Sequence, residues 1–63
     1  MMELAVGIDP DFVMALINRG VAMENLGNIE DAIESYERAL ELDPENEMAR
    51  VNLEKARSRY VLD

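Results

Sequence analysis

The feature that most constrains the fold is a 34-residue repeat within the sequence itself. The two Asp-Pro pairs, Asp9-Pro10 and Asp43-Pro44, are separated by this distance. When the sequence is shifted along itself by 34 residues, eight of the 29 overlapping positions are identical, whereas average composition gives about two matches. A repeat of this period is typical of folds in which similar helical units stack against one another.

Turn-forming residues in the sequence predict three helices. Aspartate followed by proline favours a helix start, because the carboxylate caps free amides and proline has no N–H to satisfy. Gly27 is expected to adopt the left-handed conformation that ends a helix, and Asn28 to cap the next one. We therefore expect an all-α fold with helices over about 10–26, 29–42 and 44–60.

Apolar residues recur at the three- and four-residue spacing of amphipathic helices. In the first expected helix this stripe contains Phe12, Leu16, Gly20 and Met23, together with Ala15, Ala22 and Leu26. In the second it contains Ile29, Ala32, Ile33, Tyr36, Ala39 and Leu40. The opposite side of the second helix is acidic, with Glu30, Asp31, Glu34, Glu37 and Glu41.

Composition excludes several classes of function. The 63 residues include no cysteine and no histidine, so the sequence lacks the usual ligands of zinc and iron–sulfur sites. It also lacks a glycine-rich phosphate loop and a calcium loop, so we expect no metal, no cofactor and no enzymatic activity. The net charge of −8 disfavours nucleic acid and anionic membranes as partners. No apolar run approaches the ~20 residues that span a bilayer, and a cytoplasmic protein is expected.

The sequence resembles the tetratricopeptide-repeat family. The residues at the positions of the family pattern are Leu16, Arg19-Gly20, Met23, Ala32, Tyr36, Ala39 and Pro44. The resemblance implies a fragment of a helix–turn–helix solenoid. In it, residues 13–46 form one full repeat, residues 1–12 are the remnant of a preceding repeat, and residues 47–63 form a capping helix and tail. Arg19 departs from the pattern, since leucine is usual there. Glu54 and Arg57 replace a glycine and an aromatic residue, which suits a solvent-facing cap.

The resemblance also implies a protein-binding function. Members of the family bind peptides or helices on a concave face formed by the first helix of each unit. Carried onto this sequence, that face contains Met14, Ile17, Asn18, Val21, Glu24 and Asn25, and then Met48, Val51, Asn52, Lys55 and Arg59. The two asparagines are equivalent in the repeat and either hold a peptide backbone or satisfy local groups. Lys55 and Arg59 either meet an acidic partner or are simply solvated. A clamp for terminal carboxylates is not expected, because Ile17 and Val21 take the matching places.

Because the resemblance implies that the preceding unit is truncated, the apolar face of the first helix is expected to lack most of its usual neighbour. One hypothesis is that a second copy of the chain covers this face and forms a homo-oligomer, with helices exchanged at the Gly27-Asn28 hinge as a more specific version. The alternative is that the chain belongs to a longer array. Two functions therefore remain open, namely a module that binds an external protein and a structural self-assembly unit without a separate ligand.

Overall fold

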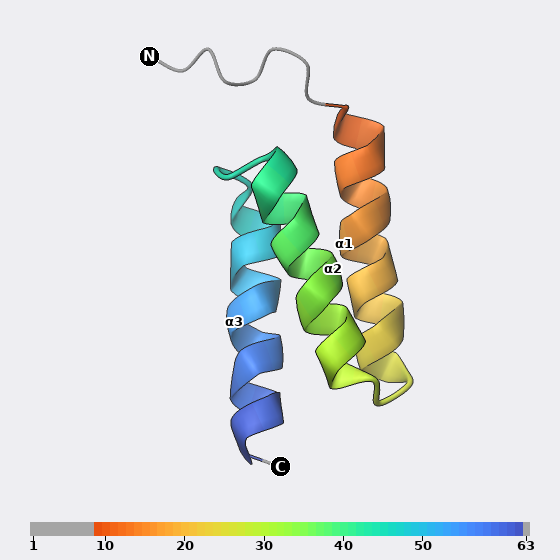
Figure 1. Cartoon of the computed structure of the whole chain (residues 1–63), viewed down its shortest axis with the longest axis vertical. Coiled ribbons are helices and arrows are strands. Elements are labelled where there is room, and N and C mark those ends of the chain that lie inside the picture. Colours follow the sequence, from red (N-terminus) through yellow and green to blue (C-terminus); the bar gives the residue numbers. More distant parts are fainter. Residues whose placement is uncertain (1–8, 63) are drawn as a thin grey trace.

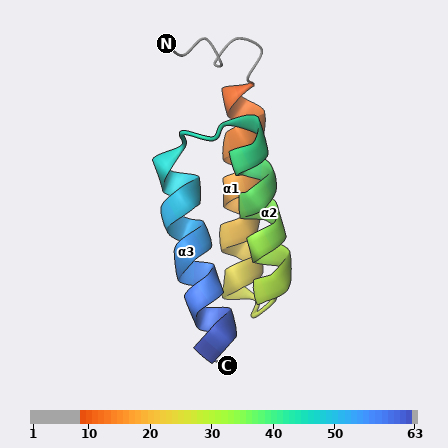
Figure 2. The same ribbon diagram turned by 60° about the vertical axis from the view of Figure 1, so that its left-hand side comes forward.

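The computed structural model describes residues 9–62, which form three helices (Figure 1). These are α1 (Pro10–Asn25), α2 (Ile29–Leu42) and α3 (Glu47–Leu62). Successive helices are antiparallel, so α1 and α3 run in the same direction, and both views show the two connecting loops at opposite ends (Figures 1 and 2). The all-α prediction is confirmed. The part of the expected preceding repeat at residues 1–8 lies outside the described residues.

The start of α1 agrees with the prediction, whereas that of α3 does not. Oδ1 of Asp9 accepts hydrogen bonds from the amides of Asp11 and Phe12, at 3.1 and 3.3 Å. The aspartate thereby satisfies two of the amides that a helix start leaves without partners. The equivalent pair Asp43-Pro44 is expected to begin the third helix, but α3 begins at Glu47.

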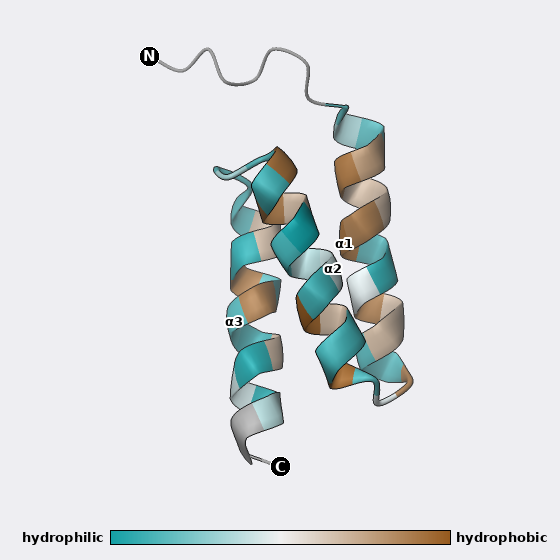
Figure 3. Ribbon diagram, viewed as in Figure 1, coloured by the Kyte–Doolittle hydropathy of each residue, from teal (hydrophilic) through white to brown (hydrophobic). Residues whose placement is uncertain are grey.

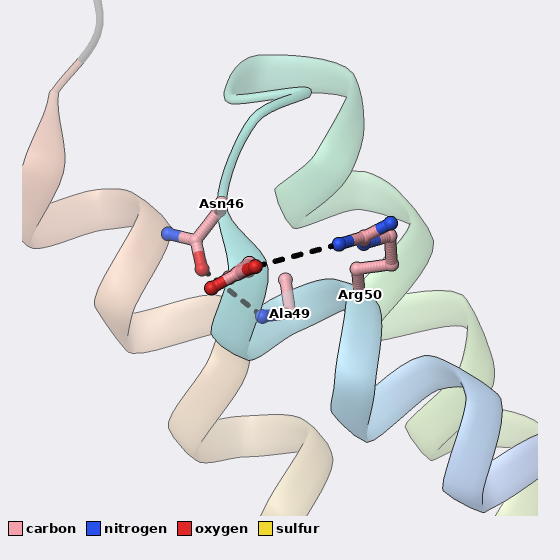
Figure 4. Close-up of polar contacts among 4 residues, drawn as sticks. Asn46, Ala49 and Arg50 are labelled. Carbon is pink, nitrogen blue, oxygen red and sulfur yellow. Dashed lines mark hydrogen bonds and ion pairs between the residues drawn. The ribbon is translucent and has the colours of Figure 1, made fainter.

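Asn46 caps α3 in place of Asp43. Its Oδ1 accepts a hydrogen bond from the amide of Ala49 at 3.0 Å (Figure 4). Asp43 instead closes α2, since its amide donates to the carbonyl of Ala39 at 2.9 Å. The 34-residue shift places Asn46 opposite Phe12, which has no side-chain acceptor. The later start of α3 follows from this difference, because only the second unit offers a capping side chain at that position.

The turn between α1 and α2 is built as expected around Gly27, which has φ 88°. Its amide donates to the carbonyl of Glu24 at 3.0 Å, and the amide of Asn28 donates to that of Met23 at 2.8 Å. These two bonds close the helix end in the pattern that requires a left-handed residue. Asn28 lies at the N-cap of α2, but its side chain makes no capping bond, so that part of the prediction is wrong. Its Nδ2 lies 3.9 Å from Sδ of Met23 instead.

The core lies where the three helices meet, and α2 packs against both neighbours. The buried apolar residues of the core are Val13, Leu16 and Ile17 from α1, Ile29, Ala32, Tyr36 and Ala39 from α2, and Ala49, Leu53 and Ala56 from α3. Gly20 and Tyr36 make the closest approach, since a Cβ built on Gly20 would lie 2.4 Å from Cε1 of the ring. The helices cross this closely because Gly20 has no side chain.

The expected stripe of α1 is divided between the core and the surface. Leu16 and Gly20 are buried and Met23 is half-buried, while four members of the stripe are exposed: Phe12, Ala15, Ala22 and Leu26. Those four were expected to share one stripe with the buried residues, and this prediction is wrong. In Figure 3, α1 is accordingly the most hydrophobic of the three helices, and the visible face of α2 is largely hydrophilic. The exposed residues leave α1 with apolar surface that no other described helix covers.

Candidate protein-binding face

Most of the residues predicted for partner binding lie on the surface of α1 and α3. The 34-residue shift relates the two rows, so Met14, Asn18, Val21 and Asn25 of α1 are equivalent to Met48, Asn52, Lys55 and Arg59 of α3. All of these are exposed except Asn52, which is half-buried. We call these eight residues, together with Glu24 and Val51, the inner face.

Ile17 is the exception among the predicted residues. It is 1% exposed and belongs to the core cluster, whereas its equivalent Val51 is 50% exposed. The two positions differ because α1 is followed by the first helix of another repeat unit, which is α3. Among residues 9–62 no such helix follows α3. Ile17 is therefore packed inside the fold, whereas Val51 lies on the surface of the described residues.

Glu24 joins all three helices at the end of α1. Its Oε1 accepts a hydrogen bond from the hydroxyl of Tyr36 on α2 at 2.9 Å, and its Oε2 lies 3.6 Å from Nη1 of Arg59 on α3. The Glu24 side chain is only 13% exposed, while that of Arg59 is 60% exposed. Burial, and then the bond to Glu24, raise the pKa of Tyr36 well above its usual range. The inner face thus ends in a fixed carboxylate with an accessible guanidinium beside it.

Two polar contacts outside the predicted site hold α3 against α2. Nη2 of Arg57 lies 3.3 Å from Oε2 of Glu37, and the hydroxyl of Tyr60 donates to Oε2 of Glu30 at 2.6 Å. The bond to Glu30 also raises the pKa of Tyr60. Arg57 was predicted only to suit a solvent-facing cap, and its ion pair with Glu37 was not predicted. The acidic side of the second helix was the signal that could have predicted this contact, because a basic side chain of a neighbouring helix is expected to pair with it.

The hydrogen bond between Tyr36 and Glu24 was not predicted, because Tyr36 was placed only in the apolar stripe of the second helix. A buried tyrosine hydroxyl usually finds a hydrogen-bond partner, and that rule points to a nearby carboxylate. In the described part of the chain, no group of three or more acidic, histidine or cysteine side chains is arranged to hold a metal ion. Residues 9–62 also contain no helix that is both long and apolar enough to cross a bilayer.

Comparison with known proteins adds two findings. The sequence profile of the tetratricopeptide repeat matches residues 13–46. The chain is also 42% identical over 53 residues to a DnaJ homolog subfamily C member 7 homolog from Dictyostelium discoideum, and the match covers 84% of this chain but 10% of that relative. No solved structure matches the chain significantly. The 34-residue period, the crossing at Gly20 and the profile agree, and the chain belongs to the tetratricopeptide-repeat family, whose repeats mediate protein–protein interaction.

Proposed function

We propose that the inner face binds a peptide or a helix of another protein. The observation that supports this is a set of four apolar side chains in equivalent rows of two parallel helices. Met14 and Val21 are each 40% exposed, and Met48 and Val51 are 51% and 50% exposed. Covering such surface stabilises a complex by about 25 cal/mol per Å², and flexible methionines adapt to different partners.

The polar residues of the inner face would orient the partner. The amides of Asn18 and Asn52 can pair with a peptide backbone, which otherwise loses its hydrogen bonds on desolvation. Lys55 and Arg59 supply positive charge to this face in a chain whose net charge is −8. In this proposal α3 acts as a capping helix, and the activity is binding without catalysis. Residence in the cytoplasm stays a prediction.

The test begins with peptides selected from a displayed random library on the immobilised chain. A variant with Val21→Asp and Val51→Asp is expected to weaken their binding by at least about tenfold, because a carboxylate would have to be desolvated in the complex. Both positions are exposed, so the fold should survive. Leu42→Asp is the matched control, since Leu42 is 42% exposed at the end of α2 and outside the inner face. If no peptide is selected, or if both variants bind equally well, the proposal fails.

A second copy of the chain is the other candidate for the inner face. The same four apolar side chains favour it, and exchange of helices at the Gly27 turn is one route to such an assembly. Sedimentation velocity as a function of concentration separates the two functions. Assembly that the Val21→Asp and Val51→Asp variant abolishes supports self-association, whereas a monomer that retains peptide binding supports the external partner. Ile17 is unsuitable for this test, because a carboxylate at that buried position would unfold the chain.

A further inference from the structure

The last part of α3 is attached to α2 by polar contacts at the surface. The side chains of residues 57–60 are all exposed, and this end of α3 extends beyond the start of α2 (Figures 1 and 2). Arg57 pairs with Glu37 of α2 at 3.3 Å. The hydroxyl of Tyr60 donates to Oε2 of Glu30, also on α2, at 2.6 Å. The position of this segment against α2 therefore depends on exposed charges and hydrogen bonds.

Tyr60 presents a phenolic hydroxyl at an accessible position. The residue is 48% exposed, whereas Tyr36, the other tyrosine of the chain, is 0% exposed. The 34-residue shift gives independent support for this accessibility. The equivalent position in α1 is Leu26, which is 70% exposed although both α2 and α3 follow it. Exposure at this position is therefore a property of the repeat unit, even when further helices follow.

We propose that Tyr60 is a site of tyrosine phosphorylation and that the phosphate releases the end of α3 from α2. A protein kinase with ATP would supply the phosphoryl group. Oη of Tyr60 forms a bond to the γ-phosphorus, the bond from that phosphorus to the bridging oxygen breaks, and ADP leaves. The phenolic proton passes to a carboxylate of the kinase. The end of a helix suits this reaction, because it opens more readily than the helix centre and can enter an external active site.

The charges on α2 oppose a phosphate at the present position of the Tyr60 hydroxyl. The carboxylates of Glu30, Glu34 and Glu37 lie along one side of α2, at spacings of four and three residues. Phosphotyrosine carries about −1.5 to −2 charges at neutral pH, and its Oη has no proton to donate. The modification would thus replace the bond to Glu30 by a repulsion between like charges at short distance.

Arg57 does not remove this conflict. It lies three residues before Tyr60 on the same side of α3, and its guanidinium is paired with Glu37. A phosphate has three strong acceptor oxygens and competes for that guanidinium. If Arg57 turns to the phosphate, the ion pair with Glu37 is lost, and if it stays, the phosphate faces Glu30 without a counterion. Both arrangements weaken the attachment of α3 to α2.

The start of α2 is the alternative place for the phosphate. Asn28 makes no side-chain capping bond there, and free amides at a helix start attract phosphate groups. The first turn of α2 already carries the carboxylates of Glu30 and Asp31, however. These two charges occupy the favourable end of the helix dipole, so a third anionic group gains little there. Release of α3 is therefore the expected outcome.

The first experiment tests whether the hydroxyl is accessible. A tyrosine kinase is chosen that phosphorylates free peptides of residues 31–41 and 54–63, and it is then given the folded chain with ATP and Mg²⁺. Mass spectrometry should show phosphate on Tyr60 at a rate at least about tenfold higher than on Tyr36. Tyr36 is the matched control because it is fully buried. Equal rates, or no phosphate on Tyr60 of the folded chain, would overturn the assignment of the site.

The second experiment measures the release of α3, using the chain synthesised with phosphotyrosine at position 60. Hydrogen exchange followed by nuclear magnetic resonance should be about two- to tenfold faster for the amides at the end of α3, and unchanged in α1. Tyr60→Phe loses the hydrogen bond without gaining charge and should show a smaller change. In the phosphorylated chain, Glu30→Gln should restore part of the protection, whereas Glu41→Gln, at the opposite end of α2, should restore none.

Three results would overturn the proposed release. Unchanged or slower exchange at the end of α3 is the first, and slower exchange would indicate that the start of α2 holds the phosphate. Equal exchange in the phosphorylated chain and in Tyr60→Phe would mean that the added charge has no effect. Equal restoration by Glu30→Gln and Glu41→Gln would remove the role given to Glu30. All of these outcomes are independent of whether the inner face binds a partner.

Discussion

Replacing Gly20 by alanine is expected to destabilise the fold although alanine is the better helix former. The added Cβ would lie 2.4 Å from Cε1, 2.7 Å from Cζ and 2.8 Å from Cδ1 of Tyr36. The ring has little room to move, because Tyr36 is fully buried and its hydroxyl is bound to Glu24. Overpacking a tight core costs about 1–3 kcal/mol, and replacing a helical glycine by alanine gains roughly 1 kcal/mol. With three contacts this short the upper part of the range applies, so the free energy of unfolding should fall by about 1–2 kcal/mol.

Urea unfolding followed by circular dichroism at the helical band measures this change. Ala22→Gly is the matched control for propensity, since Ala22 is exposed in the same helix and its replacement should cost roughly 1 kcal/mol. On a Tyr36→Leu background, Gly20→Ala should become neutral or stabilising, because the ring that it meets is gone. A higher urea midpoint for Gly20→Ala in the unchanged background would refute the close crossing of α1 and α2.

Three further expectations concern stability. Gly27→Ala should cost about 1–2 kcal/mol in urea unfolding, because φ of 88° is strained for any residue with a Cβ; no loss would contradict the turn geometry. Asn46→Ala should cost about 1 kcal/mol through loss of its cap, whereas Asn28→Ala should be nearly neutral because its side chain caps nothing; equal effects would contradict this assignment. Since the pKa of Tyr36 is raised in the folded state, the stability that its neutral hydroxyl contributes is complete below its ordinary pKa of 10.0 and is lost as pH rises beyond it. The Tyr36→Phe variant should therefore lose less unfolding free energy than the unchanged chain as the pH is raised above 10.0. An equal loss in both chains would contradict this expectation.

Much of the fold was predictable because its signals are local. The positions of Asp9 and Gly27 depend on backbone chemistry within a few residues, and both have the expected roles. The start of α3 was misplaced because two capping residues, Asp43 and Asn46, compete within one turn. Local chemistry allows either residue to cap α3. Asp43 is already the C-cap of α2, so Asn46 caps α3.

The candidate site was less predictable, because exposure depends on neighbours that the sequence does not identify. Ile17 and Val51 are equivalent in the repeat and similar in chemistry, yet one is in the core and the other is half exposed. The exposed stripe with Phe12 at its end was likewise expected to share a face with Leu16. Periodicity identifies which side chains lie on one side of a helix, but not which side a second helix covers.

The sequence by itself determined the three helices of residues 9–62, the 34-residue unit and the glycine that ends the first helix. These follow from backbone conformation, capping and side-chain volume, which act over short distances along the chain. Only the tertiary structure decided that Glu24 would be shared by Tyr36 and Arg59, that Ile17 would be buried, and that Phe12 and Leu26 of α1 would be exposed. Each of these depends on the angle and order in which α2 and α3 pack, and therefore on contacts between residues distant in sequence.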